Sequence, residues 1–110
     1  MFKKMFDRRL YQREKVELIA RYFIQDTSVK YMGCTVINLS RNGAGAFFPR
    51  QEKIEEGAVV LIDIIAPVTY QQLRLKGEIK RARKHGNVMY AGIQFIEALS
   101  EETFSMLCKA

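Results

Sequence analysis

The chain has little of the chemistry on which enzymes commonly depend. Its 110 residues include one histidine, two cysteines and no tryptophan. The single histidine, His85, cannot supply a multi-histidine metal site, and no nucleophile and base stand near it in the sequence. We therefore expect a protein that is not an enzyme, with no catalytic residue, no metal and no cofactor.

Cysteine pairs, export signals and membrane spans are equally scarce. Cys34 and Cys108 are far apart and show no CxxC spacing, so free thiols in a reducing compartment are expected. The first ten residues are basic but lack the apolar block of an export signal. The longest apolar stretch, from Ala58 to Val68, contains Asp63 and is too short to span a bilayer. These features predict a cytoplasmic protein without membrane insertion.

Two prolines and seven glycines are too few for a disordered or fibrous chain, and 48% of the residues are hydrophobic. A domain of this size buries about two-thirds of the surface that its unfolded chain exposes. The net charge of +6 is concentrated in residues 1–15 and 71–86, whereas the remainder is mildly acidic. This asymmetry favours an anionic ligand.

Short extended segments follow one another along the chain. Residues 16–24 alternate between apolar and polar, which is typical of a strand with one buried face. The other expected strands are residues 31–39, 46–48, 58–66, 73–83 and 87–97, with turn residues between them. Ser100 followed by two glutamates predicts the start of a short helix.

Six short strands and one helix predict a mainly β protein, in which an antiparallel sheet closes into a six-stranded barrel and a short helix ends the chain. We expect a single domain over residues 1–110. Its divisions would be a basic arm at 1–14, the barrel at 15–98 and the helix at 99–110.

Two motifs stand at the ends of the first strand pair. Arg9 and Arg13 form an RxxxR pattern in the basic arm, directly preceded by Arg8. Further on, the sequence from Asn38 to Gly43 reads NxSxxG, so Asn38 and Ser40 occupy alternate positions of a strand and share one side. Gly43 is expected at a tight reversal, where glycine can take a positive φ.

Together the two motifs resemble those of the PilZ family of cyclic di-GMP receptors, RxxxR followed by [D/N]xSxxG. The later run of residues 92–95, GIQF, is similar to the GxxF pattern in the family's last strand, so the resemblance extends from Asp7 to Cys108. It implies the six-stranded PilZ barrel and a ligand with two phosphates and two guanines. Arginine suits such a ligand, because a guanidinium can pair with phosphate, hydrogen-bond a guanine edge or stack on the base.

The resemblance also implies a site and a mechanism. The residues expected to bind cyclic di-GMP are Arg8, Arg9, Arg13, Asn38, Ser40 and Gly43. An arginine at the place of Arg8 goes with capture of a stacked ligand dimer, which implies two ligand molecules per protomer. The arm would close over ligand on the barrel and signal to an unidentified partner protein that controls motility, biofilm or exopolysaccharide.

Two other functions remain open. The charge of +6 and a pI near 9.5 are compatible with a small-barrel nucleic-acid-binding protein. Against it, the aromatic residues mostly follow core patterns with no platform among the basic residues; they are Tyr22, Phe47, Phe48, Tyr90 and Phe95. A protein-interaction module that no longer binds the nucleotide is the other alternative, and the intact motif pair argues against it.

Overall fold

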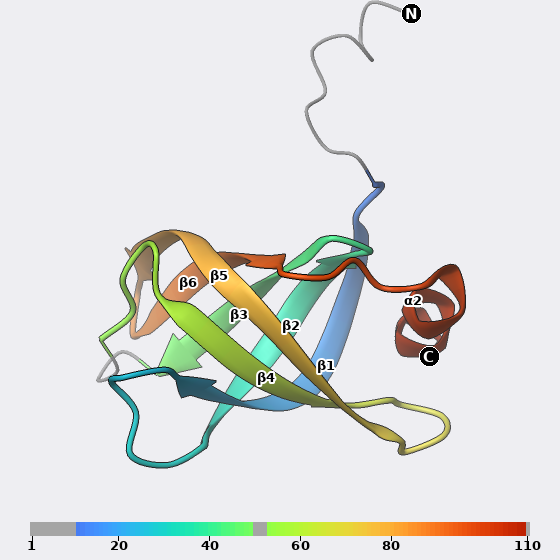
Figure 1. The fold of residues 1–110 in the computed structure, drawn as a ribbon, viewed down its shortest axis with the longest axis horizontal. Coiled ribbons are helices and arrows are strands. Elements are labelled where there is room, and N and C mark those ends of the chain that lie inside the picture. The colour runs from blue at the N-terminus through green and yellow to red at the C-terminus, as the bar shows by residue number, and fades with distance from the viewer. Residues whose placement is uncertain (1–10, 50–52, 110) are drawn as a thin grey trace, which may run out of the picture.

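The computed structural model describes residues 11–49 and 53–109, and within them the chain forms a closed antiparallel barrel and one helix (Figure 1). The strands are β1 (Glu14–Ile24), β2 (Met32–Ser40), β3 (Gly43–Pro49), β4 (Val59–Ile65), β5 (Gln72–His85) and β6 (Val88–Phe95). Around the barrel their order is β1-β2-β3-β6-β5-β4, so β3 pairs with β6 and β4 closes onto β1. The expected mainly β architecture, a six-stranded antiparallel barrel with a C-terminal helix, is confirmed.

Alternate side chains along the strands point inward and form the core of the barrel. In β1, Leu18, Ala20, Tyr22 and Ile24 are buried, while the residues between them are exposed or half-buried. The ring of Tyr22 meets that of Phe48 edge-on, with centroids 4.6 Å apart and planes at 82°. Such aromatic contacts add to the stabilisation from burying apolar area, so this pair anchors the centre of the core.

The β2–β3 and β5–β6 turns lie where the sequence predicts them, but glycine has the expected positive φ in only one of the two. Gly86 and Asn87 connect β5 to β6, with Gly86 at φ 63°. In the turn between β2 and β3, Ser40 pairs with Gly43 across Arg41 and Asn42. The positive φ expected at Gly43 is wrong, since the left-handed glycines of the described residues are Gly57 and Gly86.

The helix α2 (Glu101–Cys108) begins as the sequence predicts. Ser100 is its N-cap, and its hydroxyl accepts a hydrogen bond from the Thr103 amide at 3.1 Å. Leu107 is fully buried and joins the core. The Arg41 guanidinium donates to the Leu99 carbonyl at 2.8 Å and the Leu99 amide donates to the Arg41 carbonyl at 2.6 Å, so the β2–β3 turn holds the segment leading into α2.

One carboxylate is buried on the outer face of the barrel. Asp63 in β4 is only 2% exposed, and Arg74 binds both of its oxygens, at 2.8 and 3.1 Å. Gln72 donates to it at 3.3 Å and Arg21 lies 3.6 Å away. The hydrogen bond from Arg74 lowers the pKa of Asp63, the charges of Arg74 and Arg21 act in the same direction, and burial opposes them.

Replacing Phe48 with alanine is expected to lower the free energy of unfolding by about 3–5 kcal/mol, because it empties the centre of the core. Denaturant titration measures the change. Val29→Ala, at a side chain that is 93% exposed, is the control and should stay within about 0.5 kcal/mol of the wild type.

The lowered pKa of Asp63 predicts a specific acid sensitivity. A carboxyl whose folded pKa lies below its unfolded value of about 3.9 stabilises the fold above that value, and the stabilisation is lost as pH falls through the folded pKa. In urea titrations from pH 5 to 2, the stability of Asp63→Asn should therefore fall less steeply than that of the wild type. The exposed Glu56→Gln serves as control, and equal slopes for wild type and Asp63→Asn would contradict the prediction.

Candidate ligand-binding site

The residues of the second motif lie at the end of β2, where the ladder between β2 and β3 shifts register. The shift falls between Val36 and Asn38, after which buried Leu39 separates Asn38 from Ser40. The inward positions thus change from Val36 to Leu39, and Asn38 and Ser40 come to share the other side of the strand. This register shift therefore determines the side of β2 on which the side chains of Asn38 and Ser40 lie.

Arg13 and Asn38 are brought together. Nη1 of Arg13 donates to Oδ1 of Asn38 at 2.8 Å, across 25 positions of sequence. The Asn38 amide nitrogen donates to the hydroxyl of Tyr90 at 3.4 Å. Both ends of the amide are therefore engaged, one by the residue that leads into β1 and the other by β6. Arg8 and Arg9 lie outside the described residues.

Ser40 has a structural role in the turn. Its side chain is 1% exposed, its hydroxyl donates to Oδ1 of Asn42 at 2.6 Å and it accepts from the Asn42 amide at 3.3 Å. A second contact joins the hydroxyl to the Gly43 carbonyl at 3.4 Å. These bonds fix the turn that presents Asn42 and Gly43 beside β6.

Gly45 on β3 and Gly92 on β6 lie between Asn38 on β2 and Arg81 on β5, and we call these two residues the glycine floor. Gly45 pairs with Asn38 on β2 and with Gly92 on β6, and Gly92 pairs in turn with Arg81 on β5. A Cβ on Gly45 would collide with the side chains of Asn38 and Tyr90. A Cβ on Gly43 would lie 2.5 Å from the Ile93 carbonyl oxygen. Close approach, rather than a left-handed backbone, is why these positions need glycine.

A hollow of about 210 Å³ opens at this floor. Its lining comes from the residue before β1, from the β2–β3 turn and from β5 and β6, and consists of Arg13, Asn42, Gly43, Lys80, Arg81, Gly92, Ile93 and Gln94. Three of these side chains are cations and none is a carboxylate, although Glu78 lies 3.4 Å from Lys80. The hollow therefore favours an anion.

Sequence analysis missed Lys80, Arg81 and Gln94 as site residues. It identified residues 71–86 as basic but did not place them beside the NxSxxG motif. The pairing of β5 with β6 does so, and a register shift between Ile79 and Arg81 brings Lys80 and Arg81, neighbours in sequence, to the same hollow. The local charge was the available signal, and the strand order was the missing information.

The expectation of no aromatic platform among the basic residues is wrong. Tyr22, Phe48 and Phe95 are buried, but Phe47 and Tyr90 are only half-buried and pack together, with centroids 5.8 Å apart. The Arg83 guanidinium lies 5.6 Å from the Tyr90 ring centroid. The His85 ring also packs against Phe47, with ring centroids 5.5 Å apart. An aromatic and basic row therefore borders the glycine floor.

The described residues contain no group of three or more histidine, cysteine, aspartate or glutamate side chains arranged to hold a metal ion. Among the same residues, α2 is too short and too polar to cross a membrane.

The family model of the PilZ domain matches residues 7–108. The chain belongs to the PilZ domain family. The family predicted from the sequence is thus confirmed. PilZ domains are a family of cyclic di-GMP receptors that are generally not enzymes. No curated protein matches the chain significantly.

Solved PilZ-type structures share the fold. The inhibitor of motility MotI/DgrA of Bacillus subtilis superposes with a TM-score of 0.75 at 15% identity, covering 94% of this chain and 50% of that one. The PilZ domain of YcgR from Escherichia coli, solved with c-di-GMP, gives 0.68 at 15% identity over 93% and 89%. The PilZ domain of CeSA from a cellulose-synthesizing bacterium gives 0.60 at 18% over 84% and 88%. The present chain thus spans half the length of MotI/DgrA.

The crowding at Gly43 predicts that Gly43→Ala lowers the free energy of unfolding by about 1–3 kcal/mol, because the new methyl would press on the Ile93 carbonyl. Gly33→Ala is the matched control, since nothing lies within 4 Å of a Cβ there. Thermal unfolding of both variants measures the difference. Equal stabilities would show that the close approach does not constrain position 43.

Proposed function

We propose that the protein is a non-catalytic cyclic di-GMP receptor of the cytoplasm, with its ligand site at the cationic hollow and glycine floor described above. The observation that carries the proposal is the convergence of Arg13, from the RxxxR motif, with Asn38 of the NxSxxG motif at 2.8 Å. Residues distant in sequence meet beside a hollow whose three cations suit phosphate groups.

The chemistry of the site fits both parts of this ligand. Arg13 and Arg81 can each pair with a phosphate or hydrogen-bond a guanine edge, and Asn38 offers a donor and an acceptor to the base. The glycine at position 45 lets the side chains of Asn38 and Tyr90 lie directly against the backbone of β3, which holds Asn38 beside the hollow. Ser40 contributes by holding the turn, and Gly43 by allowing β3 to approach β6.

The arm supplies the switch in this proposal. Arg8 and Arg9 add two cations a few residues before Arg13 in the sequence. Arg8 recruits a second ligand molecule, which stacks on the first. When cyclic di-GMP binds, the arm closes over it, because the contacts between arm and ligand exist only in the closed state. The closed arm presents a new surface to a partner protein that controls motility, biofilm or exopolysaccharide.

Calorimetric titration with cyclic di-GMP tests the site. Arg13→Ala should weaken binding by roughly 10- to 100-fold, as expected from the loss of about 1.5–3 kcal/mol for a hydrogen bond to a charged group. Lys30→Ala, which removes one exposed positive charge elsewhere, is the control and should bind like the wild type. Wild-type affinity for folded Arg13→Ala would refute the proposed site.

The stoichiometry of the same titration tests Arg8. Two ligands per protomer are expected for the wild type and one for Arg8→Ala. GTP and linear diguanylate should not compete. A stoichiometry of one for both proteins would overturn the role of Arg8 without touching that of Arg13.

The half-buried pair Phe47 and Tyr90 beside Arg83 favours a second candidate function, binding of single-stranded nucleic acid. Titration with a labelled oligonucleotide separates the two. Salt-dependent binding that ignores base identity, in a protein that does not bind cyclic di-GMP, would favour this alternative.

A further inference from the structure

Exposed apolar side chains gather at one end of the barrel. Of the six large hydrophobic residues that are exposed in the described chain, four lie on β1, at the end of β4 or in the loop that follows; they are Ile19, Ile65, Val68 and Tyr70. Ile19 is 76% exposed and Tyr70 is 77% exposed. Such a concentration marks an interaction surface more often than chance exposure does.

The same region contains an unpaired strand edge. The ladder between β1 and β4 ends at the pair Ala20 and Ile64, whereas β1 itself extends back to Glu14 on its β2 side. Residues 15–19 of β1 therefore have no β4 partner. A strand edge of this kind presents backbone donors and acceptors that another strand can pair with.

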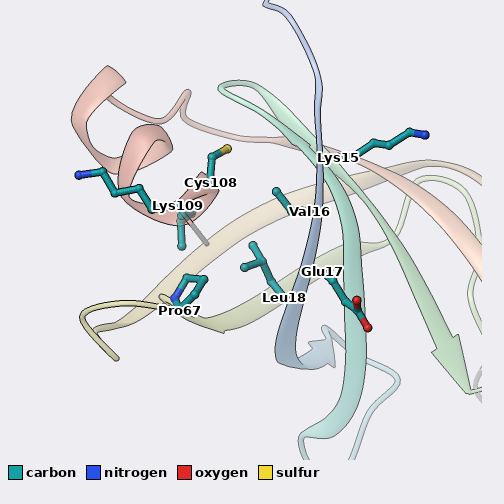
Figure 2. A pocket seen from close by; sticks show the side chains of 8 residues that line it. Lys15, Val16, Glu17, Leu18, Pro67, Cys108 and Lys109 are labelled. Atoms are coloured by element: carbon teal, nitrogen blue, oxygen red, sulfur yellow. The ribbon is translucent and has the colours of Figure 1, made fainter.

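Two adjoining hollows lie along this edge. The first, of about 430 Å³, lies between β1, α2 and Pro67 and is lined by the consecutive residues 15–18 (Figure 2). The second, of about 380 Å³, is lined by residues 17–19, by residues 65–67 and by Tyr70. Consecutive residues of a strand alternate between its faces, so a hollow that they line together borders the strand's edge. We call the two hollows together the trough.

The sides of the trough are suited to alternate side chains of an extended peptide. In Figure 2, Val16 and Leu18 point towards Pro67 and the end of α2, whereas Lys15 and Glu17 point to the other side of β1. The second hollow is mainly apolar, with Ile19 and Ile65 in its lining. A strand laid along the edge would direct its side chains alternately into the two hollows.

Charge indicates the composition of that strand. Lys15 and Lys109 border the first hollow. Among the residues that the structure describes, Glu17 is the one whose side-chain carboxylate lines the trough. Cations thus exceed carboxylates around an apolar centre, which complements a segment with apolar residues flanked by acidic ones.

Tyr70 supplies an independent observation. It adopts φ 59°, a left-handed backbone that is a true outlier for a bulky residue, while its side chain remains exposed beside the second hollow. Such strain persists where the surrounding structure imposes it and is found at ligand clamps. The Tyr70 amide donates to the Ala66 carbonyl at 2.9 Å, so the β4–β5 turn holds this backbone and places the ring beside the second hollow.

We propose that the trough is a docking site for a partner protein, which adds an extended segment with alternating apolar residues and acidic flanks to the free edge of β1. A second copy of this chain is a poorer fit, because each copy carries a net charge of +6. An anionic membrane is also a poorer fit, because a lipid surface offers no strand to pair with the free edge of residues 15–19.

The test is selection of a displayed library of random 12-residue peptides on the wild-type protein. Selected peptides should carry apolar residues at alternate positions with aspartate or glutamate beside them. Ile19→Asp should weaken their binding at least tenfold, because a carboxylate would enter the apolar hollow. Val29→Asp, at another highly exposed apolar residue away from the trough, should leave binding unchanged.

Backbone amide exchange identifies the mode of binding. A selected peptide should protect amides within residues 15–19, as strand addition requires. Protection confined to another part of the chain, or peptides insensitive to Ile19→Asp, would overturn the proposal. So would an absence of selected peptides, dimerisation of the free protein that Ile19→Asp abolishes, or binding to anionic vesicles that it abolishes.

Tyr70→Asn is a second variant with opposite effects on stability and binding. Asparagine tolerates a left-handed backbone, so the variant should melt at a higher temperature than the wild type. The same variant should bind the selected peptides more weakly because the ring is lost. A variant that is more stable and binds equally well would remove Tyr70 from the trough.

Discussion

The antiparallel pairing of β3 with β6 is the constraint on which the rest of this structure depends. It closes the barrel between the hairpin of β2 and β3 and the hairpin of β5 and β6. The approach is possible at Gly43 because no Cβ stands between its backbone and the Ile93 carbonyl. The same pairing carries Arg81 to within reach of the NxSxxG turn, so one ladder both completes the core and assembles the ligand hollow.

Two described residues of the arm contact the barrel: Arg13 donates to the side-chain amide of Asn38, and Tyr11 lies under the Arg41 guanidinium, 4.7 Å from the ring centroid. Asn38 accepts from Arg13 and donates to Tyr90. In the proposed receptor, a ligand group that takes the place of this hydrogen bond would exchange an interaction within the protein for interactions with the ligand. The net gain is smaller than the sum of the new contacts, because the old contact is lost.

Much of the fold could be predicted from the sequence because its signals are local. Alternation in β1, the Gly86-Asn87 turn and the Ser100 cap each depend on a few adjacent residues, and they lie where the sequence predicts. The two motifs identified the family for the same reason. Strand order, in contrast, depends on contacts between distant segments. It is what brings Arg81 to the hollow and leaves Phe47 and Tyr90 outside the core.

The register shifts could not be predicted from the sequence either, because a bulge changes the face on which a residue lies without leaving a distinctive local pattern. Shifts occur in β2 before Asn38 and in β5 before Arg81, on both sides of the glycine floor. Each one redirects a polar or charged side chain that strict alternation would have turned towards the core. Two of the register shifts in the described strands therefore lie beside the candidate site, whereas the shift between Lys15 and Leu18 of β1 does not.

Strand β1 connects the two surfaces to which we assign functions. Arg13 at the ligand hollow precedes Glu14, the first residue of β1, and Lys15 already lines the trough. The ladder between β1 and β2 shifts register between Lys15 and Leu18, so this part of β1 is held less regularly than the part that follows. Under the proposed mechanism, a ligand that displaces Arg13 would act next on this adjoining edge. Since coupling is reciprocal, a partner strand that orders residues 15–19 would also change the affinity for the ligand. The strength of that coupling is limited to the difference in partner affinity between the open and closed states of the arm.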